Sequence, residues 1–388
     1  EALTRQVAAL RFPLPRAAFS RSAWVLEPPP VLALMAKLRE GGVPLKDDAA
    51  AEPYRGVLTG FNEAFVVDQA ARDRLAKEDP RSAELLKPFL RGEDIGRWAA
   101  EWQGRWMIVM PTSADHAWPW AHMDLDAAEA CFQASFPAIA RHLGAHRATL
   151  RAREDQGRFW WELRPCAYYA AFDAPKIVWQ EIQYHPAFAR DAAGLFVNNK
   201  AFLLPSSDPF LLAALNSPAL WWFNWRHLAR MKDEALTPQA FRMVEVPIPR
   251  PDAAAADEAA TRTEACAAIT RERLAAAAQL RDWYAAAWGL ERPPRALAEP
   301  WALDAQGFLD ALKAALPAKR RAFTSAQTRA IRAEHAASIA PMQARLAALA
   351  AHERALSALV NRAFGLTPEE VKLMWKTAPP RMPIAPEA

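Results

Sequence analysis

Residues from Asp252 onward differ in composition from the rest of the chain, and this difference restricts the possible folds most strongly. The segment 253–288 is rich in alanine and carries charged residues at helical spacing, and further helical patterns follow at 303–316 and 325–364. In the last of these, one face carries an apolar stripe made by Leu346, Leu349, Leu356, Leu359 and Val360. We therefore predict an antiparallel helical pair or a short coiled coil, with the charged residues on its solvated face.

Residues 51–250 instead mix both kinds of secondary structure. Strands are expected at 61–67, 106–110, 176–182 and 195–204, and helices at 68–77, 125–153 and 209–230. Strands and helices do not alternate regularly, so a doubly wound sheet is not expected. The predicted fold class is therefore α+β, with a mixed α/β domain followed by an α-helical, coiled-coil-like C-terminal region.

Four segments are expected along the chain. Residues 1–50, which Leu14-Pro15 and Pro28-Pro29-Pro30 interrupt, are interpreted as a connector with a short helix from Val31 to Glu40. Residues 51–250 form the mixed domain, and residues 251–375 form a helical spacer or interaction region. The Pro-rich residues 376–388 are expected to be a disordered tail.

The overall composition argues against several classes of protein. With 388 residues, 52% hydrophobic and 24% charged, the chain is of the globular type and its net charge of +4 permits nucleic-acid binding. Cys131, Cys166 and Cys266 are scattered, so we expect no disulfide framework or zinc cage, and a cytoplasmic location. No apolar run is long enough for a membrane span, and no secretion signal is expected. Because the chain begins with Glu1, we expect that it starts inside a longer protein.

The segment 87–98 (KPFLRGEDIGRW) joins a proline, a glycine-containing turn and three basic residues between two aromatic ones. Such a loop holds cationic and planar groups at a surface, where phosphates and bases can be bound. It belongs to an ordered set of short motifs: RGVLTGFNEAFVV at 55–67, APKIV at 174–178, NNK at 198–200, LNSP at 215–218 and VPIP at 246–249.

In this order the motifs resemble the TaqI-like target-recognition (specificity) domain of adenine-specific DNA methyltransferases, which include fused type II restriction-modification and BREX-type phage-defence enzymes. The resemblance covers roughly residues 50–250. It implies sequence-specific binding of double-stranded DNA beside a methyltransferase catalytic domain or subunit. Residues 1–50 are then the connector from an upstream methyltransferase domain. Glu93 stands where the family often has a basic residue, so one phosphate contact fewer is expected.

Catalytic residues are not expected in this chain. The family's Pro-Pro-aromatic loop, which holds the flipped adenine, has no counterpart, because no aromatic residue follows Pro28-Pro29-Pro30, Pro293-Pro294 or Pro379-Pro380. No glycine-rich loop after a strand offers a cofactor site. We therefore expect no cofactor here, and S-adenosylmethionine in the catalytic domain.

DNA contacts are expected from polar residues at strand ends and turns, and from a basic helix. Asn is a natural bidentate partner of adenine, and Arg or Lys of guanine and phosphate. Alternatively, Asn62 and Asn198-Asn199 form only turns, and the basic helix is a solvated face paired with Glu154 and Asp155. The candidate residues are Thr59, Asn62, Lys87, Arg91, Arg97, Arg141, Arg147, Arg151, Lys176, Asn198, Asn199 and Lys200.

Three alternatives concern other chemistry. His142 and His146 lie near Cys131 and one helical turn apart, which fits either a zinc site or ordinary surface histidines. Glu370 and Lys372 have the spacing of a metal-dependent nuclease, although Thr367-Pro368 also marks an ordinary helix start. In the third alternative, the chain is a scaffold whose C-terminal helices dock a methyltransferase.

Two aromatic-rich regions complete the expectations. Trp160-Trp161 and Trp221-Trp222 are interpreted as core pairs rather than platforms for stacked bases. Residues 118–126 match no motif of the family and are interpreted as a variable base-reading loop.

Overall fold

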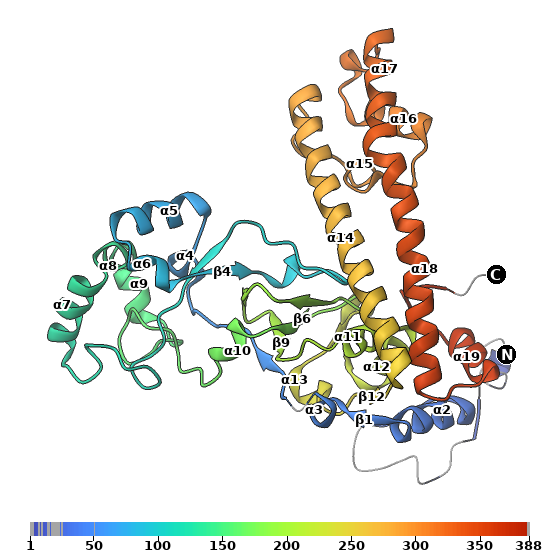
Figure 1. Ribbon diagram of the computed structural model, residues 1–388, viewed down its shortest axis with the longest axis horizontal. Helices are drawn as coiled ribbons and strands as arrows, with labels where there is room; N and C mark the ends of the chain where they lie inside the picture. Colours follow the sequence, from blue (N-terminus) through green and yellow to red (C-terminus); the bar gives the residue numbers. More distant parts are fainter. Residues whose placement is uncertain are drawn as a thin grey trace.

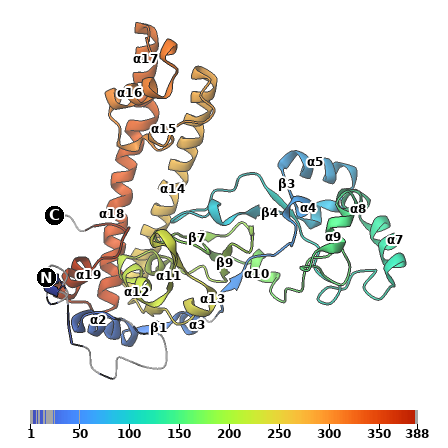
Figure 2. The same cartoon turned by 180° about the vertical axis from the view of Figure 1, so that it is seen from behind.

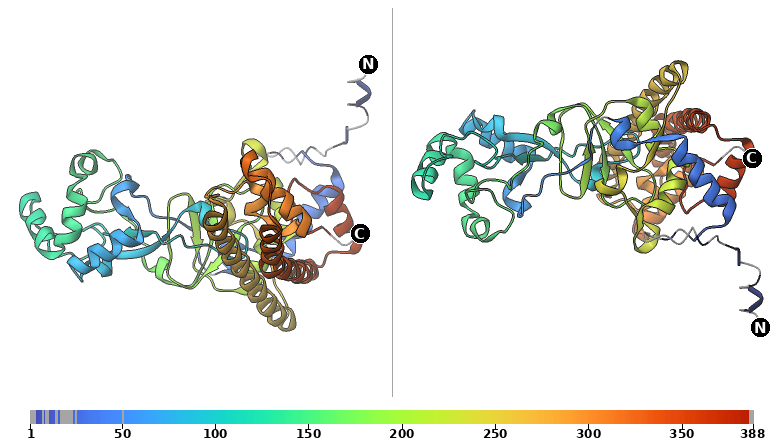
Figure 3. Two further views of the ribbon diagram at one scale, coloured as in Figure 1. Left: turned by 90° about the horizontal axis from the view of Figure 1, so that it is seen from above. Right: turned by 90° about the horizontal axis from the view of Figure 1, so that it is seen from below.

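The computed structural model describes residues 4–6, 8, 11–13, 16, 24, 26–49 and 51–385. Figure 1 shows a central body, a lobe that extends to one side, and a long helical arm that rises from the body. The view from behind shows the same separation (Figure 2), and from above and below the lobe and body lie in line (Figure 3). The small sheets and the helical C-terminal region confirm the predicted α+β class. The proposed break at Leu14-Pro15 lies outside the described residues.

Two four-stranded sheets frame the body and the lobe. The antiparallel body sheet has the order β2 (Tyr54–Arg55), β9 (Ala201–Leu204), β6 (Lys176–Gln180) and β7 (Phe188–Asp191). The lobe sheet has the order β3 (Val66–Val67), β5 (Trp106–Ile108), β4 (Leu86–Leu90) and β8 (Phe196–Val197), with β4 and β8 parallel. Because β9 follows β8 directly, the turn 198–200 connects the two sheets.

Strand β6 is buried on both faces, which explains its nearly continuous apolar sequence. Ile177 and Trp179 pack into the body core, whereas Val178 between them packs into the lobe core. This alternation follows from the two-residue period of a strand. The two cores therefore share one sheet, and the lobe and body are held together through it.

Helices complete both cores. The body core includes residues from α2 (Pro29–Glu40), α11 (Pro209–Leu215), α12 (Pro218–His227) and α19 (Pro368–Lys376). The lobe carries α5 (Gln69–Glu78), α7 (Leu125–Ser135), α8 (Pro137–Gly144) and α9 (Arg147–Ala152). Trp160-Trp161 lie in the lobe core and Trp221-Trp222 in the body core, as predicted.

Two predicted long helices are divided by local chemistry. The helix expected at 125–153 breaks at Phe136, because the following Pro137 disfavours helical backbone there and starts α8. The helix expected at 209–230 breaks before α12, where the Ser217 hydroxyl accepts a hydrogen bond from Leu220 N at 3.1 Å. The strand expected at 61–67 is mostly the helical turn α4 (Asn62–Phe65), and only β3 is extended.

The arm consists of α14 (Ala253–Trp288) and α18 (Ala340–Ala363), which run antiparallel side by side (Figures 1 and 2). Asp252 caps α14 by accepting a bond from Ala255 N at 2.8 Å, and Gly289 ends the helix in the left-handed conformation. Between the long helices lie α15 (Arg295–Ala298), α16 (Ala305–Ala315) and α17 (Ser325–Glu334), around a third apolar core. A π-helical turn precedes α18, where Pro341 removes one backbone donor.

The residues after α19 return to the body. Trp221 Nε1 donates to Pro380 O at 3.2 Å, and Arg381 donates to Asp233 O at 3.2 Å. These contacts place part of the segment after residue 376 against the body, and residues 386–388 lie outside the described residues, so the disordered tail stays a prediction. Among the described residues, no helix combines the length and apolarity that a membrane span requires.

Candidate nucleic-acid interface

The turn 198–200 lies where the two sheets meet, and it brings three sequence motifs together. Asn198 N donates to Leu90 O at 3.2 Å, and Val57 forms a parallel bridge with Asn198. The Asn198 side chain accepts from Lys200 N at 3.2 Å, which fixes the shape of the turn. The motifs at 55–67, 87–98 and 198–200, far apart along the chain, are thus neighbours in space.

Two glycines allow this close approach. A Cβ atom on Gly56 would lie 2.0 Å from Asn198 O, and one on Gly92 would lie 2.7 Å from Lys200 O. Real side chains do not tolerate such distances to backbone, so both positions require glycine. The arginine that precedes each glycine, Arg55 or Arg91, is thereby held beside the turn.

Two adjoining hollows open on this surface. One, of about 410 Å³, is lined by Arg91, Gly92, Glu93, Gln180, Glu181, Ile182, Asn198 and Lys200. The other, of about 300 Å³, is lined by Asn62, Glu63, Val66, Phe89, Arg91 and Asn198. Arg91 and Asn198 line both hollows, so we name this region, together with Arg55, the junction surface.

The junction surface alternates positive and negative groups. Glu181 accepts from Arg55 at 2.9 Å and from Lys200 at 3.1 Å, while Arg91 lies 3.3 Å from Glu93. Exposed pairs of this kind contribute about 0–1 kcal/mol, so a bound ligand can displace them at little cost. Hydrogen-bond donors, acceptors and the 37%-exposed Ile182 thus stand side by side.

Asn62 lines one hollow of the junction surface, whereas the other candidate residues on the lobe line neither hollow. Asn62 accepts from the buried Thr59 hydroxyl at 2.7 Å, and Lys87 lies 3.7 Å from Asp173. Arg141 pairs with Glu78 at 2.7 Å, and Arg147 pairs with Glu129 at 2.6 Å. Arg151, in contrast, is exposed on α9, and no ion pair is found for it in the described part of the chain.

Lys176 and Arg97 are engaged in ion pairs within the protein, one buried and one largely buried. Lys176 is fully buried and lies 2.5 Å from Asp191, because the β6–β7 register puts the two residues opposite each other. Arg97 donates to Glu353 of α18 at 2.5 Å and to Asn216 O at 2.6 Å, which fastens the arm to the body. Both interactions are structural, so we do not include these residues, or the buried Thr59, in the interface.

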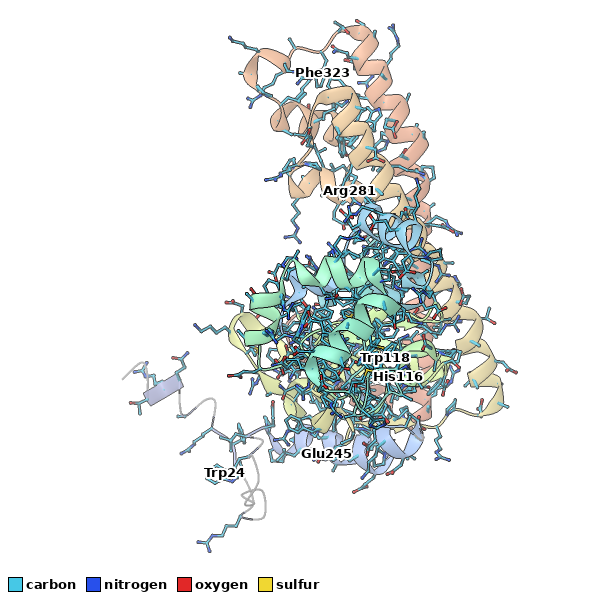
Figure 4. All side chains as sticks on the ribbon, turned by 90° about the vertical axis from the view of Figure 1, so that its left-hand side faces the viewer. Trp24, His116, Trp118, Glu245, Arg281 and Phe323 are labelled. Atoms are coloured by element: carbon cyan, nitrogen blue, oxygen red, sulfur yellow. The ribbon has the colours of Figure 1, made fainter. Side chains whose placement is uncertain are left out.

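The segment 118–126 begins in an aromatic cluster of the lobe. Trp118 stacks on Trp120 with ring centroids 4.8 Å apart. The ring centroid of His116 lies 4.2 Å from that of Trp118. Figure 4 shows His116 and Trp118 close together on the lobe. A hollow of about 340 Å³ here is lined by Lys87, Trp118 and Phe136 among others, so Lys87 faces this hollow rather than the junction surface.

The contacts of His142 and Glu370 do not support the zinc and nuclease alternatives. His142 Nε2 lies 2.9 Å from Ala64 O, and burial lowers the pKa of His142. No cluster of three or more His, Cys, Asp or Glu side chains suited to a metal occurs within the described ranges. Glu370 forms a capping box with Thr367 and an ion pair with Lys37 at 2.5 Å, as an ordinary helix start would.

Sequence reasoning missed several members of the junction surface. Arg55 and Glu93 lie inside quoted motifs, but their side chains were not expected to take part. Gln180 is the last residue of β6 and Glu181 and Ile182 follow it, and only the fold brings them to the turn. A polar run directly after a buried strand is the one signal that points to them.

Comparison with known proteins gives limited similarity. Residues 252–360, which form most of the arm, match the model of a domain of unknown function, DUF8810. The solved structure of the type IIL restriction-modification enzyme MmeI in complex with DNA is similar to this chain, with a TM-score of 0.38 and 11% sequence identity. The similarity covers 84% of this chain, which spans 35% of the length of that enzyme chain. No curated protein matches the sequence.

Proposed function

We propose that this chain is the DNA-recognition part of an adenine-specific DNA methyltransferase or restriction-modification system. The observation that carries the proposal is the convergence of the motifs at 55–67, 87–98 and 198–200 on one solvent-open surface. The resemblance of these motifs to target-recognition domains rests on the sequence alone. Their convergence gives the resemblance a physical meaning.

The chemistry of the junction surface suits base edges better than phosphates alone. Arg91 and Lys200 can donate to guanine, while Asn62 and Asn198 can both donate to and accept from adenine. Glu93 can accept from the cytosine amino group, which explains an acid where a phosphate-binding loop would have a cation. Ile182 offers an apolar contact for a thymine methyl group. Cations on the lobe, with Arg151 foremost, would hold the backbone and fix the register.

The methyl-transfer chemistry is assigned to a separate catalytic domain or subunit. When bound there, S-adenosylmethionine supplies the methyl group. Gly56 and Gly92, two closely packed glycines of this chain, lie against its own turn at 198–200 and so leave no cradle for that cofactor at this place. The role of the junction surface is therefore to place the target sequence, and not to act on the adenine.

Docking through an apolar helix face is not proposed as a second function. Such docking needs large apolar side chains exposed along the helices. Among the described residues, all the large exposed apolar side chains precede residue 252, and the last of them is Phe241.

The test is selection of bound sequences from a randomised duplex pool. The wild-type protein should enrich a consensus, with or without S-adenosylmethionine. Arg91→Ala should relax one position of that consensus, at a cost of about 1–3 kcal/mol. Arg345→Ala is the matched control, since Arg345 is paired with Glu272 on the arm and should change nothing. Failure of the wild-type protein to bind duplex DNA at low salt would overturn the proposal.

A further inference from the structure

The end of the arm is rich in basic residues over a continuous stretch of sequence, of which Lys313 alone, among the described residues, lies within ion-pair distance of an acid there, Asp310. Residues 311–333 contain six basic residues and no acidic one. The whole chain has a net charge of only +4, so the rest of the molecule is slightly negative. The six are Lys313, Lys319, Arg320, Arg321, Arg329 and Arg332.

Most of these residues lie at the extremity of the molecule. Residues 317–332, which we name the arm tip, comprise the turn after α16 and most of α17, at the top of the arm in Figure 1. Figure 4 shows Phe323, in the middle of this turn, at the far end of the arm.

The cations of the arm tip lack the partners that those of the junction surface have. Lys319, Arg320, Arg329 and Arg332 are exposed, and none of them forms an ion pair within the part of the chain that the structure describes. Arg292 and Arg295, on the segment just after α14, are likewise exposed and without an ion pair among the described residues. Unpaired cations gathered in one place repel each other, so the arrangement costs stability unless an anion binds.

The turn that presents these cations is held in place. Arg321, the exception among them, donates to Leu316 O at 2.9 Å and closes the turn after α16. Phe323 packs on Trp288 with ring centroids 5.0 Å apart. Thr324 caps α17 by accepting from Gln327 N at 3.2 Å. The free cations therefore stand on a fixed support, which reduces the entropy lost on binding.

We propose that the arm tip binds the phosphate backbone of duplex DNA beside the recognised sequence. The inference rests on the proposed function, because it assigns a role within the same DNA complex. Cations without acids suit phosphates, whereas the mixed charges of the junction surface suit base edges. The tip exposes no large apolar side chain within the described residues, as a membrane-inserting or protein-docking surface would.

The length of the arm sets the length of DNA that the contact needs. Helix α14 has 36 residues. At 1.5 Å per residue it spans about 54 Å, as much as about 16 base pairs of duplex. A duplex that covers only the junction surface is thus too short to reach the tip, and a longer one gains the additional contacts.

The experiment compares random duplexes of about 12 and about 40 base pairs across a salt series. The variant carries Lys319→Gln, Arg320→Gln, Arg329→Gln and Arg332→Gln, since Gln retains helix propensity. With four contacts, the log–log salt slope on the long duplex should become shallower by up to about 3.6. The loss of affinity that the four substitutions cause should be larger near 50 mM salt than near 200 mM salt, by up to about 100-fold. Binding to the short duplex should stay unchanged.

The control removes the same number of charges from the shaft of the arm. Arg262, Arg271, Arg273 and Arg345 each lie within ion-pair distance of a carboxylate there, and their replacement by Gln should leave both duplexes bound as before. An equal loss in both variants, or no loss on the long duplex, overturns the arm-tip contact. If the wild-type protein binds neither duplex, the proposed function itself fails. Thermal melting of each variant verifies that the arm is folded.

Discussion

The junction surface and the arm tip use the same basic residue types in opposite settings. At the junction, Arg91, Arg55 and Lys200 each have a carboxylate within ion-pair distance. At the tip, Arg329 and Arg332 have none among the described residues. Paired cations are held in a fixed geometry and contribute little long-range field, whereas unpaired cations attract any polyanion. The net charge of the chain therefore does not indicate which surface is suited to base edges and which is suited only to phosphates.

The largest expected effect on stability concerns the buried ion pair between Lys176 and Asp191. Lys176→Met leaves Asp191 charged and buried, and should lower the free energy of unfolding by about 3–5 kcal/mol in urea titrations followed by tryptophan fluorescence. The double variant Lys176→Met/Asp191→Asn removes both charges and should recover part of the loss. At the tip, Arg329→Gln should cost less than about 0.5 kcal/mol. A small cost for Lys176→Met would remove the distinction between structural and DNA-binding cations.

The next effect tests the packing that creates the junction surface. Gly56→Ala places a methyl group 2.0 Å from Asn198 O, so the turn must shift. Overpacking of this kind costs about 1–3 kcal/mol, and we expect weaker DNA binding by the folded fraction as well. Gly144→Ala is the matched control, because nothing lies within 4 Å of its new methyl group. Thermal melting and duplex binding should separate the two, and equal behaviour would contradict the role of Gly56.

Acid should lower the free energy of unfolding through three histidines, which lie in the body and the lobe. Burial lowers the pKa of His142, His185 and His227 from the usual 6.5. The folded state therefore binds fewer protons than the unfolded state, and this stability is present above pH 6.5 and lost as the pH falls through the folded values. The slope is at most about 1.4 kcal/mol per pH unit for each histidine.

The measurement is the urea midpoint at stepped pH values below about 7. It should fall with pH, and His142→Gln should make the fall shallower. Carboxylates whose pKa is lowered, such as Glu272, act in the same direction but only below their usual pKa of 4.5. A midpoint that rises as the pH falls from 6.5 would show that these histidines are not buried in their neutral form.

The sequence predicted some of these features better than others. The bounds of α14 follow from composition, because alanine favours helix at every position and Asp252 and Gly289 supply both caps. The convergence at the turn 198–200 was not predicted, since long-range strand pairing sets it. The burial of Lys176 was not predicted, because it depends on the β6–β7 register that places Asp191 opposite. The acid-free stretch 311–333 can be counted in the sequence, but the lack of ion-pair partners can be seen only in the fold.

The smallest expected effect compares a paired arginine with an unpaired arginine within the lobe. Arg141 and Arg151 lie on neighbouring helices, but Arg141 is paired with Glu78 and Arg151 has no ion pair in the described ranges. If pairing separates structural from phosphate-binding cations, Arg151→Ala should reduce the salt slope of DNA binding by about 1, and Arg141→Ala by less. Neither change should alter the free energy of unfolding by more than about 0.5 kcal/mol. Equal slopes for both variants would mean that a phosphate displaces the Glu78 carboxylate as easily as it displaces water. Pairing would then no longer mark the cations that do not bind phosphate, and the arm tip would differ from the lobe only in its number of charges.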